Sequence, residues 1–485
     1  MRPTMTNPRP FLRATAAIAL SAVLAALAAC AGGPETIDNP AAVLTQTGLP
    51  KERYAAAIEA ARTRGADDAT RAALRRMVVA DGFGVPSREE AFRFLLEVDR
   101  AGLVDALTNG LPRMSSLEWR RRVCELVADA GLVELVPTLI RAWANPVVGL
   151  DGDGPRPERV ALGRLVGEDR IGATLVATMR ESSPTTQANL RARCWELLMK
   201  TGDEGRLRAL LADPEATRGD AMLTDLARVA NELGVLPTTR EEILWARDLC
   251  RPERQAFFES AREALAKMPL ARRNALEIRA VPLAVACARN RPELLAADEA
   301  ELAAAIERRI DGRRKASPDF TGYGSGFSET FYDARAKLLW TDLAAMTLAL
   351  DLLDTPALRL HLFEVADRDR EDRATEYGGV IALDSSGRGE FLEFAPRVKA
   401  GDVRYESPQA LFDALYTGLL HVHFHAQRYD NSDYAGPHLG DFAFAEETRC
   451  SGIVLAFLGP DELGVDFYRH GRVVVDLGAI RRPDA

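Results

Sequence analysis

Apolar residues recur at helical spacing through most of the first two thirds of the chain. Between residues 49 and 311 the sequence is a succession of stretches rich in alanine and leucine, with almost no β-branched alternation. This pattern predicts amphipathic α-helices that pack through their apolar faces. Three stretches have a hydroxyl residue followed three positions later by glutamate, the pattern of a capping box. We therefore expect helices to start at Ser87, Ser115 and Thr239.

The helical region contains one short repetition. Ala101-Gly102-Leu103-Val104-Asp105 returns further along the chain as Ala130-Gly131-Leu132-Val133-Glu134, and the second copy continues as Leu135-Val136-Pro137-Thr138-Leu139-Ile140. That second stretch resembles the second helix of a HEAT-type repeat. Two copies leave two architectures open, a HEAT-like array and an irregular helical bundle. Charges are interspersed and histidine is absent between residues 49 and 311, so we expect this region to serve as a spacer or a docking surface.

Residues 312–370 connect the helical region to the next domain. A glycine-rich stretch, Gly322–Gly326, predicts a loop or linker. Two helices are expected after it, Phe331–Leu353 and Pro356–Ala366, and the sequence leaves open which domain they join. The charged run Asp367–Arg373 marks the expected domain boundary.

Beyond residue 371 the period of the hydrophobic pattern changes from about 3.6 residues to about 2. Ser407 before Pro408 predicts the start of a helix, and a second helix is expected after Asp441. We expect strands at Tyr377–Leu383, Gly389–Pro396, Gly418–His425, Gly452–Leu458, Val465–Tyr468 and Arg472–Leu477. Residues 371–482 should therefore form an α+β domain. The predicted fold class is multidomain, an all-α region followed by a C-terminal α+β domain.

The N-terminus resembles a bacterial lipoprotein signal. Three arginines precede an uncharged run, Ala14–Ala29, which ends at Leu27-Ala28-Ala29-Cys30. A membrane-spanning helix needs about 20 apolar residues, and this uncharged run is shorter than that. The resemblance implies removal of the signal peptide, residues 1–29, and lipidation of Cys30. In such proteins, aspartate directly after the lipidated cysteine implies retention at the inner membrane. Residue 31 is alanine, so the resemblance implies an anchor in the outer membrane of the cell envelope. Residues 30–48 would be a tether. The alternative is an ordinary cleaved signal with an incidental cysteine.

Composition narrows the classes of function. Lys and Arg number 62 against 71 Asp and Glu, a formal charge of −9, and loss of three arginines with the signal gives −9 − 3 = −12. No stretch is basic enough to bind a nucleic acid backbone, so we expect no nucleic-acid partner. Five cysteines remain besides Cys30 and form no C-x-x-C pair. Because five is an odd number, at least one thiol should be free.

Four of the six histidines lie between residues 421 and 438. In the expected strand, alternation puts His421, His423 and His425 on one face. Two imidazoles two residues apart can chelate one zinc ion, and a third ligand with a water would complete a tetrahedral site. The alternative is a strand face on which the histidines form hydrogen bonds or lie at the surface.

The segments around these histidines resemble the JAB/MPN domain, the fold of the JAMM metalloproteases. The resemblance covers about residues 376–478, under a quarter of the chain. It rests on Glu376 before a strand, His423-Phe424-His425 at a strand end, Gly436–Asp441 opening a helix, and the terminal strands. It implies that Zn²⁺ is held by His423, His425 and Asp441, with water in the fourth position, and that Glu376 is the general base. Pairing of His421 with His423 stays open, because the sequence does not fix the strand register.

The chain departs from the family pattern between the second histidine and the aspartate. The segment from His425 to Asp441 is longer than is usual in the family, and His438 stands where the family has a serine that stabilises the tetrahedral intermediate. His438 would supply an imidazole N–H in place of the hydroxyl, add a metal ligand, or mark the loss of peptidase activity. In the longer loop, Tyr429, Asp430, Asp433 and Tyr434 either line a substrate groove or are ordinary loop residues.

The resemblance implies an envelope-anchored, zinc-dependent peptidase or isopeptidase. Its partners would be a protein or peptide substrate and, through the lipid anchor, a membrane. The first alternative is a non-catalytic lipoprotein scaffold whose JAB-like module binds metal or peptide. A further alternative is a cupin-like oxygenase with an H-x-H site, which would bind iron rather than zinc.

Overall fold

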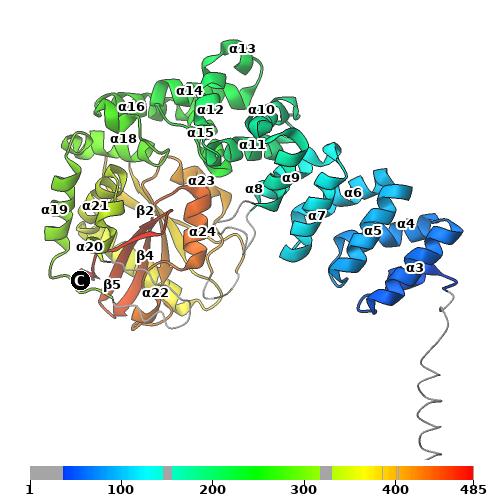
Figure 1. Ribbon diagram of the computed structural model, residues 1–485. Helices are drawn as coiled ribbons and strands as arrows, with labels where there is room; N and C mark the ends of the chain where they lie inside the picture. The colour runs from blue at the N-terminus through cyan, green and yellow to red at the C-terminus, as the bar shows by residue number, and fades with distance from the viewer. Residues whose placement is uncertain are drawn as a thin grey trace, which may run out of the picture. The chain divides into compact units, whose positions relative to one another are not determined.

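The structure is a computed structural model that describes residues 37–145, 156–316, 330–384, 386–399, 401 and 404–483. It is mostly helical, with one mixed β-sheet near the C-terminus (Figure 1). The chain divides into two compact units, Met1–Ile171 and Gly172–Ala485. The division lies inside the helical region that we expected at residues 49–311, because the helices after residue 171 group with the sheet.

Several parts of the sequence argument lie outside the described residues. They are the signal peptide (residues 1–29), Cys30 and the glycine-rich stretch Gly322–Gly326. Within the described residues, no helix is both long enough and apolar enough to cross a bilayer. The five cysteines that the structure describes are all free thiols, which agrees with the expectation of at least one.

The first unit is built from helices that pack on their neighbours and on the next helix but one. Thus α3 packs on α5, α4 on α6 and α7 on α9. The α-helices are α2 (Pro40–Leu44), α3 (Lys51–Arg64), α4 (Asp68–Val79), α5 (Val85–Val98), α6 (Arg100–Gly110), α7 (Leu117–Asp129), α8 (Val136–Ala144) and α9 (Pro157–Val166). Short 3-10 turns occupy Leu111–Arg113 (η1), Val133–Leu135 (η2) and Glu168–Arg170 (η3).

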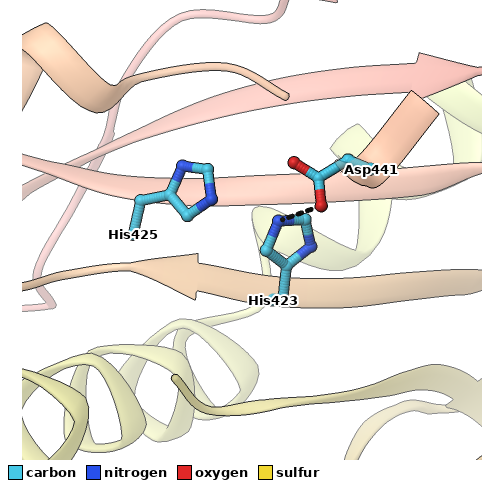
Figure 2. A group of neighbouring side chains, drawn as sticks. All are labelled: His423, His425 and Asp441. Carbon is cyan, nitrogen blue, oxygen red and sulfur yellow. Dashed lines mark ion pairs between the residues drawn. The ribbon is translucent and has the colours of Figure 1, made fainter. Parts of the chain in front are cut away.

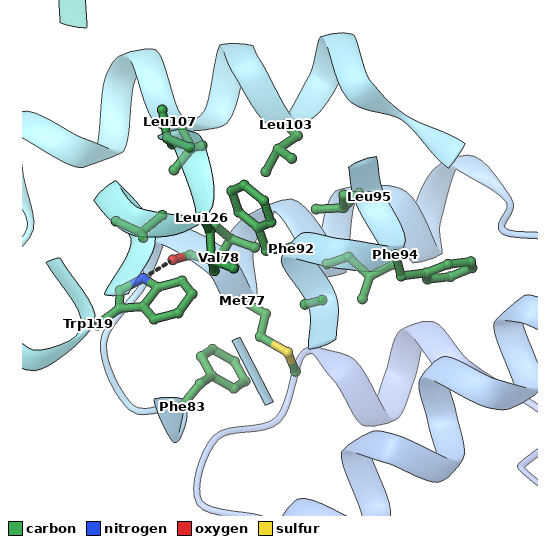
Figure 3. Close-up of a cluster of buried hydrophobic side chains, with 14 of the residues drawn as sticks. Met77, Val78, Phe83, Phe92, Phe94, Leu95, Leu103, Leu107, Trp119 and Leu126 are labelled. Carbon is green, nitrogen blue, oxygen red and sulfur yellow. Dashed lines mark hydrogen bonds between the residues drawn. The ribbon is translucent and has the colours of Figure 1, made fainter. Parts of the chain in front are cut away.

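A continuous apolar core runs between these helices (Figure 3). Trp119 of α7 is fully buried in it, and its indole Nε1–H donates to the carbonyl of Val78 at the end of α4 over 2.8 Å. The indole therefore joins two helices by a hydrogen bond as well as by packing.

Of the three helix starts predicted from capping boxes, two are wrong. Helix α5 begins at Val85 rather than at Ser87, because Pro86 is favoured in a first helical turn, and Ser87 lies within that turn. Helix α7 is capped by Ser116, whose side chain accepts the N–H of Trp119, and not by Ser115. Thr239 caps its helix as expected.

The repetition in the sequence is not a repetition in structure. Gly102 lies inside helix α6, whereas Gly131 adopts a left-handed conformation (φ 59°) that ends helix α7. The N–H groups of Gly131 and Leu132 then donate to the carbonyls of Ala128 and Val127, which closes the helix end. Glycine permits both conformations, so the shared letters do not fix one local structure.

The second unit begins with helices and ends with the sheet. Its helices are α10 (Ile171–Glu181), α11 (Ala188–Lys200), α12 (Glu204–Ala212), α13 (Pro214–Thr217), α14 (Ala221–Leu233), α15 (Arg240–Leu249), α16 (Gln255–Ala266), α17 (Leu270–Arg273), α18 (Ala280–Asn290), α19 (Glu299–Ile310), α20 (Phe331–Ala334), α21 (Trp340–Leu353), α22 (Pro356–Glu371), α23 (Gln409–Leu415) and α24 (Leu439–Thr448). The 3-10 turns are η4 (Pro252–Arg254), η5 (Pro292–Leu295), η6 (Arg335–Lys337) and η7 (Ser432–Tyr434).

The sheet contains every strand that the alternation predicted. Its strands are β1 (Gly378–Leu383), β2 (Gly389–Phe394), β3 (Leu420–His425), β4 (Gly452–Gly459), β5 (Glu462–Arg469), β6 (Val473–Asp476) and the short β7 (Ile480–Arg481). The order is β2-β1-β3-β4-β5-β6, with β7 beside β5. Strands β3 and β4 are parallel and the other pairs are antiparallel. The described chain thus has a helical part followed by a C-terminal α+β part, as expected.

Helices cover opposite faces of this sheet. On one face, His361 and Phe363 of α22 contact Phe391 of β2 and Phe457 of β4, respectively. On the other face, Phe442 of α24 joins an apolar cluster that includes Val454 and Tyr468. Because Val454 pairs directly with His423, the histidine side chains of β3 lie on the face that α24 covers.

The two helices before the sheet differ from their predicted bounds. The expected helix Phe331–Leu353 is broken, because Leu339 is extended and its N–H donates to buried Asp342, which starts α21. Helix α22 continues to Glu371 and packs on β2. The charged run Asp367–Arg373 is therefore mostly helix against the sheet rather than a boundary between domains.

Candidate metal centre

Strand β3 carries three buried histidines on one face. It lies in the interior of the sheet, between β1 and β4, and every residue of the strand is buried. His421, His423 and His425 are 5%, 2% and 3% exposed. Buried polar side chains generally need partners, and for these imidazoles such partners have to come from other elements or from a bound ion.

Asp441 is fixed by the start of helix α24. Its Oδ2 accepts the backbone N–H of His438, the N-cap residue, over 2.7 Å. A carboxylate in the first turn is also stabilised by the helix dipole. This bond leaves Oδ1 directed at His423, whose Nε2 lies 3.2 Å away. The local helix start therefore positions a carboxylate over the histidine face.

His423, His425 and Asp441 form one compact group. Figure 2 shows the two rings and the carboxylate facing one another, and one ligand atom from each residue lies within 4.8 Å of the other two. Zinc ligands at about 2.0–2.1 Å in a tetrahedron lie about 3.3 Å apart. The 3.2 Å separation of His423 Nε2 and Asp441 Oδ1 matches that edge. The other separations are at most 4.8 Å and exceed it by up to about 1.5 Å.

A hydrogen bond fixes the tautomer of His425. Its Nδ1–H donates to the backbone carbonyl of Tyr434 over 2.7 Å. Burial, followed by the charge of His423, lowers the pKa of His425 to about 3, so the ring is neutral at pH 7. The proton therefore sits on Nδ1, and Nε2 presents its lone pair to the group. This arrangement is usual for histidines that bind metals.

His423 differs electrostatically from its neighbours. Burial alone would lower the pKa of His423, but the carboxylate of Asp441 outweighs it, and more distant carboxylates add to the effect, so the pKa is raised. Burial opposes the same pairing at Asp441, whose pKa is nevertheless held below its usual range by His423. A cation in this position is thus favoured, whether it is a proton or a metal ion.

The ring of His423 also fits a metal ligand by its hydrogen bonding. Both ring nitrogens are buried, and neither has a hydrogen-bond partner of good geometry among the described residues. Buried ring nitrogens without a well-aligned hydrogen-bond partner are uncommon in folded proteins. The donor set of two imidazoles and one carboxylate is the chemistry that zinc favours in catalytic sites. The residues present therefore fit a zinc ion.

Glu376 reaches the same group from a different strand. It precedes β1, is 6% exposed, and its Oε1 lies 3.9 Å from Nε2 of His425. Antiparallel pairing of β1 with β3, with Gly378 opposite His423, brings it there. A carboxylate at this distance can exchange a proton with a water held between the groups.

His421 lies on the same face but outside the compact group. Its Nδ1 lies 3.3 Å from the hydroxyl of Tyr468, and its ring contacts Phe444 of α24. Burial and then the charge of His423 lower its pKa to about 3. The geometry thus groups His423 with His425 and not with His421.

His438 stacks on a member of the group. Its ring lies 4.6 Å from the ring of His425, with the planes 21° apart. Burial lowers its pKa, which leaves a neutral ring with one N–H donor. His438 is near the group but is not one of its three clustered ligands.

The sequence argument missed Asp369. This residue of α22 is 1% exposed, and its two oxygens accept the backbone N–H groups of Tyr377 (2.8 Å) and Ala426 (3.2 Å). These residues directly follow Glu376 and His425. A signal existed, because Asp369 continues the helical spacing of the buried residues Val365 and Ala366 and so places an acid on the apolar face of α22.

In the loop after β3, a backbone carbonyl contacts the candidate site, whereas the side chains considered for a substrate groove make other contacts. Tyr429 packs on Phe457, and Asp433 pairs with Arg428 at the surface. Tyr434 contributes its carbonyl to His425. Asn431, which the sequence argument did not mention, is buried, and its Nδ2 donates to the carbonyl of His425.

Comparison with protein-family models, curated proteins and solved structures finds no match to this chain.

Proposed function

We propose that this chain is an envelope-anchored, zinc-dependent peptidase or isopeptidase of the JAMM type. In this proposal the α+β part is a JAB/MPN-like domain, the preceding helices include a HEAT-like array that presents it to a protein or peptide substrate, and Cys30 carries the lipid that holds the chain at the outer membrane. The observation that carries the proposal is the approach of Glu376 to the group formed by His423, His425 and Asp441.

Each residue of the group has a role in this mechanism. His423, His425 and Asp441 would hold the zinc, which when bound supplies Lewis-acid activation of a water and of the substrate carbonyl. Glu376 takes a proton from the attacking water and delivers it to the leaving amine. The carbonyl of Tyr434 keeps His425 in the tautomer with a free Nε2.

His438 takes the place of the family's serine in this proposal. Its neutral imidazole provides one N–H that can donate to the developing oxyanion, and its stacking on His425 holds it beside the reacting groups. His438→Ser should therefore retain more activity than His438→Ala.

The first experiment measures metal content. Zinc is determined by elemental analysis in the full chain, purified in detergent, and in Asp441→Asn, whose amide oxygen can still accept the N–H of His438 and so keep the helix cap. We expect about one zinc per chain in the parent and almost none in Asp441→Asn or His423→Ala. Asp67→Asn is the matched control, because Asp67 caps α4 by accepting the N–H of Thr70. Full zinc content in Asp441→Asn would refute the ligand set, and iron in place of zinc would favour the oxygenase alternative.

The second experiment measures hydrolysis. Glu376→Gln should retain zinc and lose about 100-fold or more in peptide cleavage, the usual contribution of a general base. A zinc-loaded parent that cleaves no member of a peptide library, together with a Glu376→Gln variant that changes no measured property, would leave the scaffold alternative in its place.

A further inference from the structure

A second candidate site lies in a cavity of about 340 Å³ in the second unit, and none of the residues of the candidate metal centre lines it. Its walls come from the turn after α19, the end of α21, helix α22 and strands β5 and β7. Four of its lining residues are arginines, namely Arg313, Arg314, Arg359 and Arg481. The carboxylates that line it are those of Asp354 and Glu462.

Each of these carboxylates is already shared between two arginines. Glu462 pairs with Arg314 at 2.7 Å and with Arg481 at 3.2 Å. Asp354 pairs with Arg309 of α19 at 2.7 Å and with Arg313 at 3.5 Å. The lining residues, with four guanidiniums and two carboxylates, therefore carry a formal net charge of +2.

Arg359 is the lining arginine whose positive charge is most clearly unbalanced. Its Nε is buried without a hydrogen-bond partner, and no carboxylate of the described residues lies within ion-pair distance of its guanidinium. Its charge is also felt by Arg313, whose pKa is lowered by burial and by repulsion from Arg309 and Arg359, against the attraction of Asp354. A buried donor without an acceptor is unfavourable unless a ligand supplies one.

Backbone packing positions the turn that carries Arg313 and Arg314. The carbonyl of Arg314 accepts the N–H of Ala479 over 2.7 Å, which ties the turn to β7. Gly478 has a left-handed conformation (φ 77°), and a Cβ there would lie 2.4 Å from Cβ of Arg313. The chain therefore leaves room for Arg313 at the wall of the cavity.

We propose that this arginine pocket binds the dianionic phosphate group of a small phosphorylated molecule. Guanidinium forks match the geometry of phosphate oxygens. A phosphate monoester carries a charge of about −1.5 to −2 at pH 7, which balances the two surplus charges. The cavity volume falls in the range of small-ligand sites, about 300–1,000 Å³. Ala479 and Ile480 supply an apolar wall for the remainder of the ligand. This site does not depend on the zinc proposal.

The experiment measures phosphate binding by the full chain with isothermal titration calorimetry and thermal unfolding. Inorganic phosphate is compared with sodium chloride at equal ionic strength, because surface charges respond to any salt. Two further probes separate the possible sources of phosphate. Glycerol 3-phosphate represents a free metabolite, and phosphatidylcholine vesicles with or without phosphatidic acid as a minor component represent a lipid headgroup.

Arg359→Gln should weaken binding by about tenfold or more. Because Arg359 has no acidic partner among the described residues, the variant should unfold at the same or a higher temperature than the parent in the absence of phosphate. Arg308→Gln is the matched control, since Arg308 is exposed on α19 and does not line the cavity; it should change the affinity less than twofold. Zinc content should be unchanged in both variants.

Binding of glycerol 3-phosphate or of phosphatidic acid vesicles would support the site and identify the source of the phosphate. Failure of all three phosphate probes to bind, or equal weakening in Arg359→Gln and Arg308→Gln, would overturn the proposal.

Discussion

Replacing Asp369 by asparagine tests whether a residue of α22 helps to hold together the group formed by His423, His425 and Asp441. The two carboxylate oxygens of Asp369 accept the N–H groups of Tyr377 and Ala426, one at the start of β1 and one at the end of β3. These N–H groups follow Glu376 and His425 in the chain. Asp369 thus ties the proposed general base to a proposed ligand through two backbone segments.

The expected effect follows from the hydrogen bonds. Asparagine has one acceptor oxygen, so one of the two buried N–H groups would meet an amide N–H instead. Loss of a hydrogen bond to a charged acceptor costs about 1.5–3 kcal/mol. If the zinc-bound geometry requires both segments in place, that energy appears in zinc binding. Every 1.4 kcal/mol corresponds to a factor of ten, so the affinity should fall about 10- to 100-fold.

Competition with a chromogenic chelator measures zinc affinity, and urea denaturation of the metal-free chain measures stability. The matched control is Asp384→Asn, because Asp384 accepts the N–H groups of Ser386 and Arg388 at the opposite end of β1. The control should bind zinc with the parent's affinity. A destabilised Asp369→Asn chain whose zinc affinity stays within twofold of the parent would refute the reasoning and leave Asp369 a purely structural role.

Two further predictions concern stability. Burial raises the pKa of Glu242 from 4.5 to about 7, so this group destabilises the folded state increasingly as pH rises from 4.5 to 7. In denaturant titrations, the free energy of unfolding of Glu242→Gln should therefore rise by about 3 kcal/mol relative to that of the parent between pH 4.5 and pH 8. A difference that does not change with pH would contradict this. Trp119→Phe removes the hydrogen bond to the carbonyl of Val78 and part of a buried ring. The free energy of unfolding of the first unit in urea should fall by about 2–4 kcal/mol, and zinc affinity should not change. A loss of stability below about 1 kcal/mol would contradict this prediction.

Local patterns predicted the elements of the sheet well. Alternation of side chains is a property of each strand by itself, so the bounds of β1, β3 and β4 could be predicted closely from the sequence. Helix starts were predicted less accurately, because several neighbouring residues could each serve as the N-cap. Pro86 moved the start of α5 ahead of Ser87, and Ser116 took the place of Ser115.

Long-range features escaped the sequence argument. The division after Ile171 depends on which helices pack together, and nothing in the helical pattern distinguishes one amphipathic face from another. The role of Asp369 also depends on packing, although its helical spacing placed it on the buried face of α22. The charged run around it predicted a domain boundary, and only the docking of α22 on the sheet turns Asp369 toward the backbone of β1 and β3.

The sequence by itself determined which donors are available and that the three histidines share one face of their strand, because strand periodicity is local. The tertiary structure decided the grouping. The start of α24 places Asp441 beside His423, the carbonyl of Tyr434 orients His425, and the pairing of β1 with β3 brings Glu376 within 3.9 Å of His425. His421 lies outside this group, and its Nδ1 contacts the hydroxyl of Tyr468 instead. Segments far apart in the chain meet here through strand pairing and helix docking, and those contacts depend on the packing of the whole second unit rather than on any local pattern.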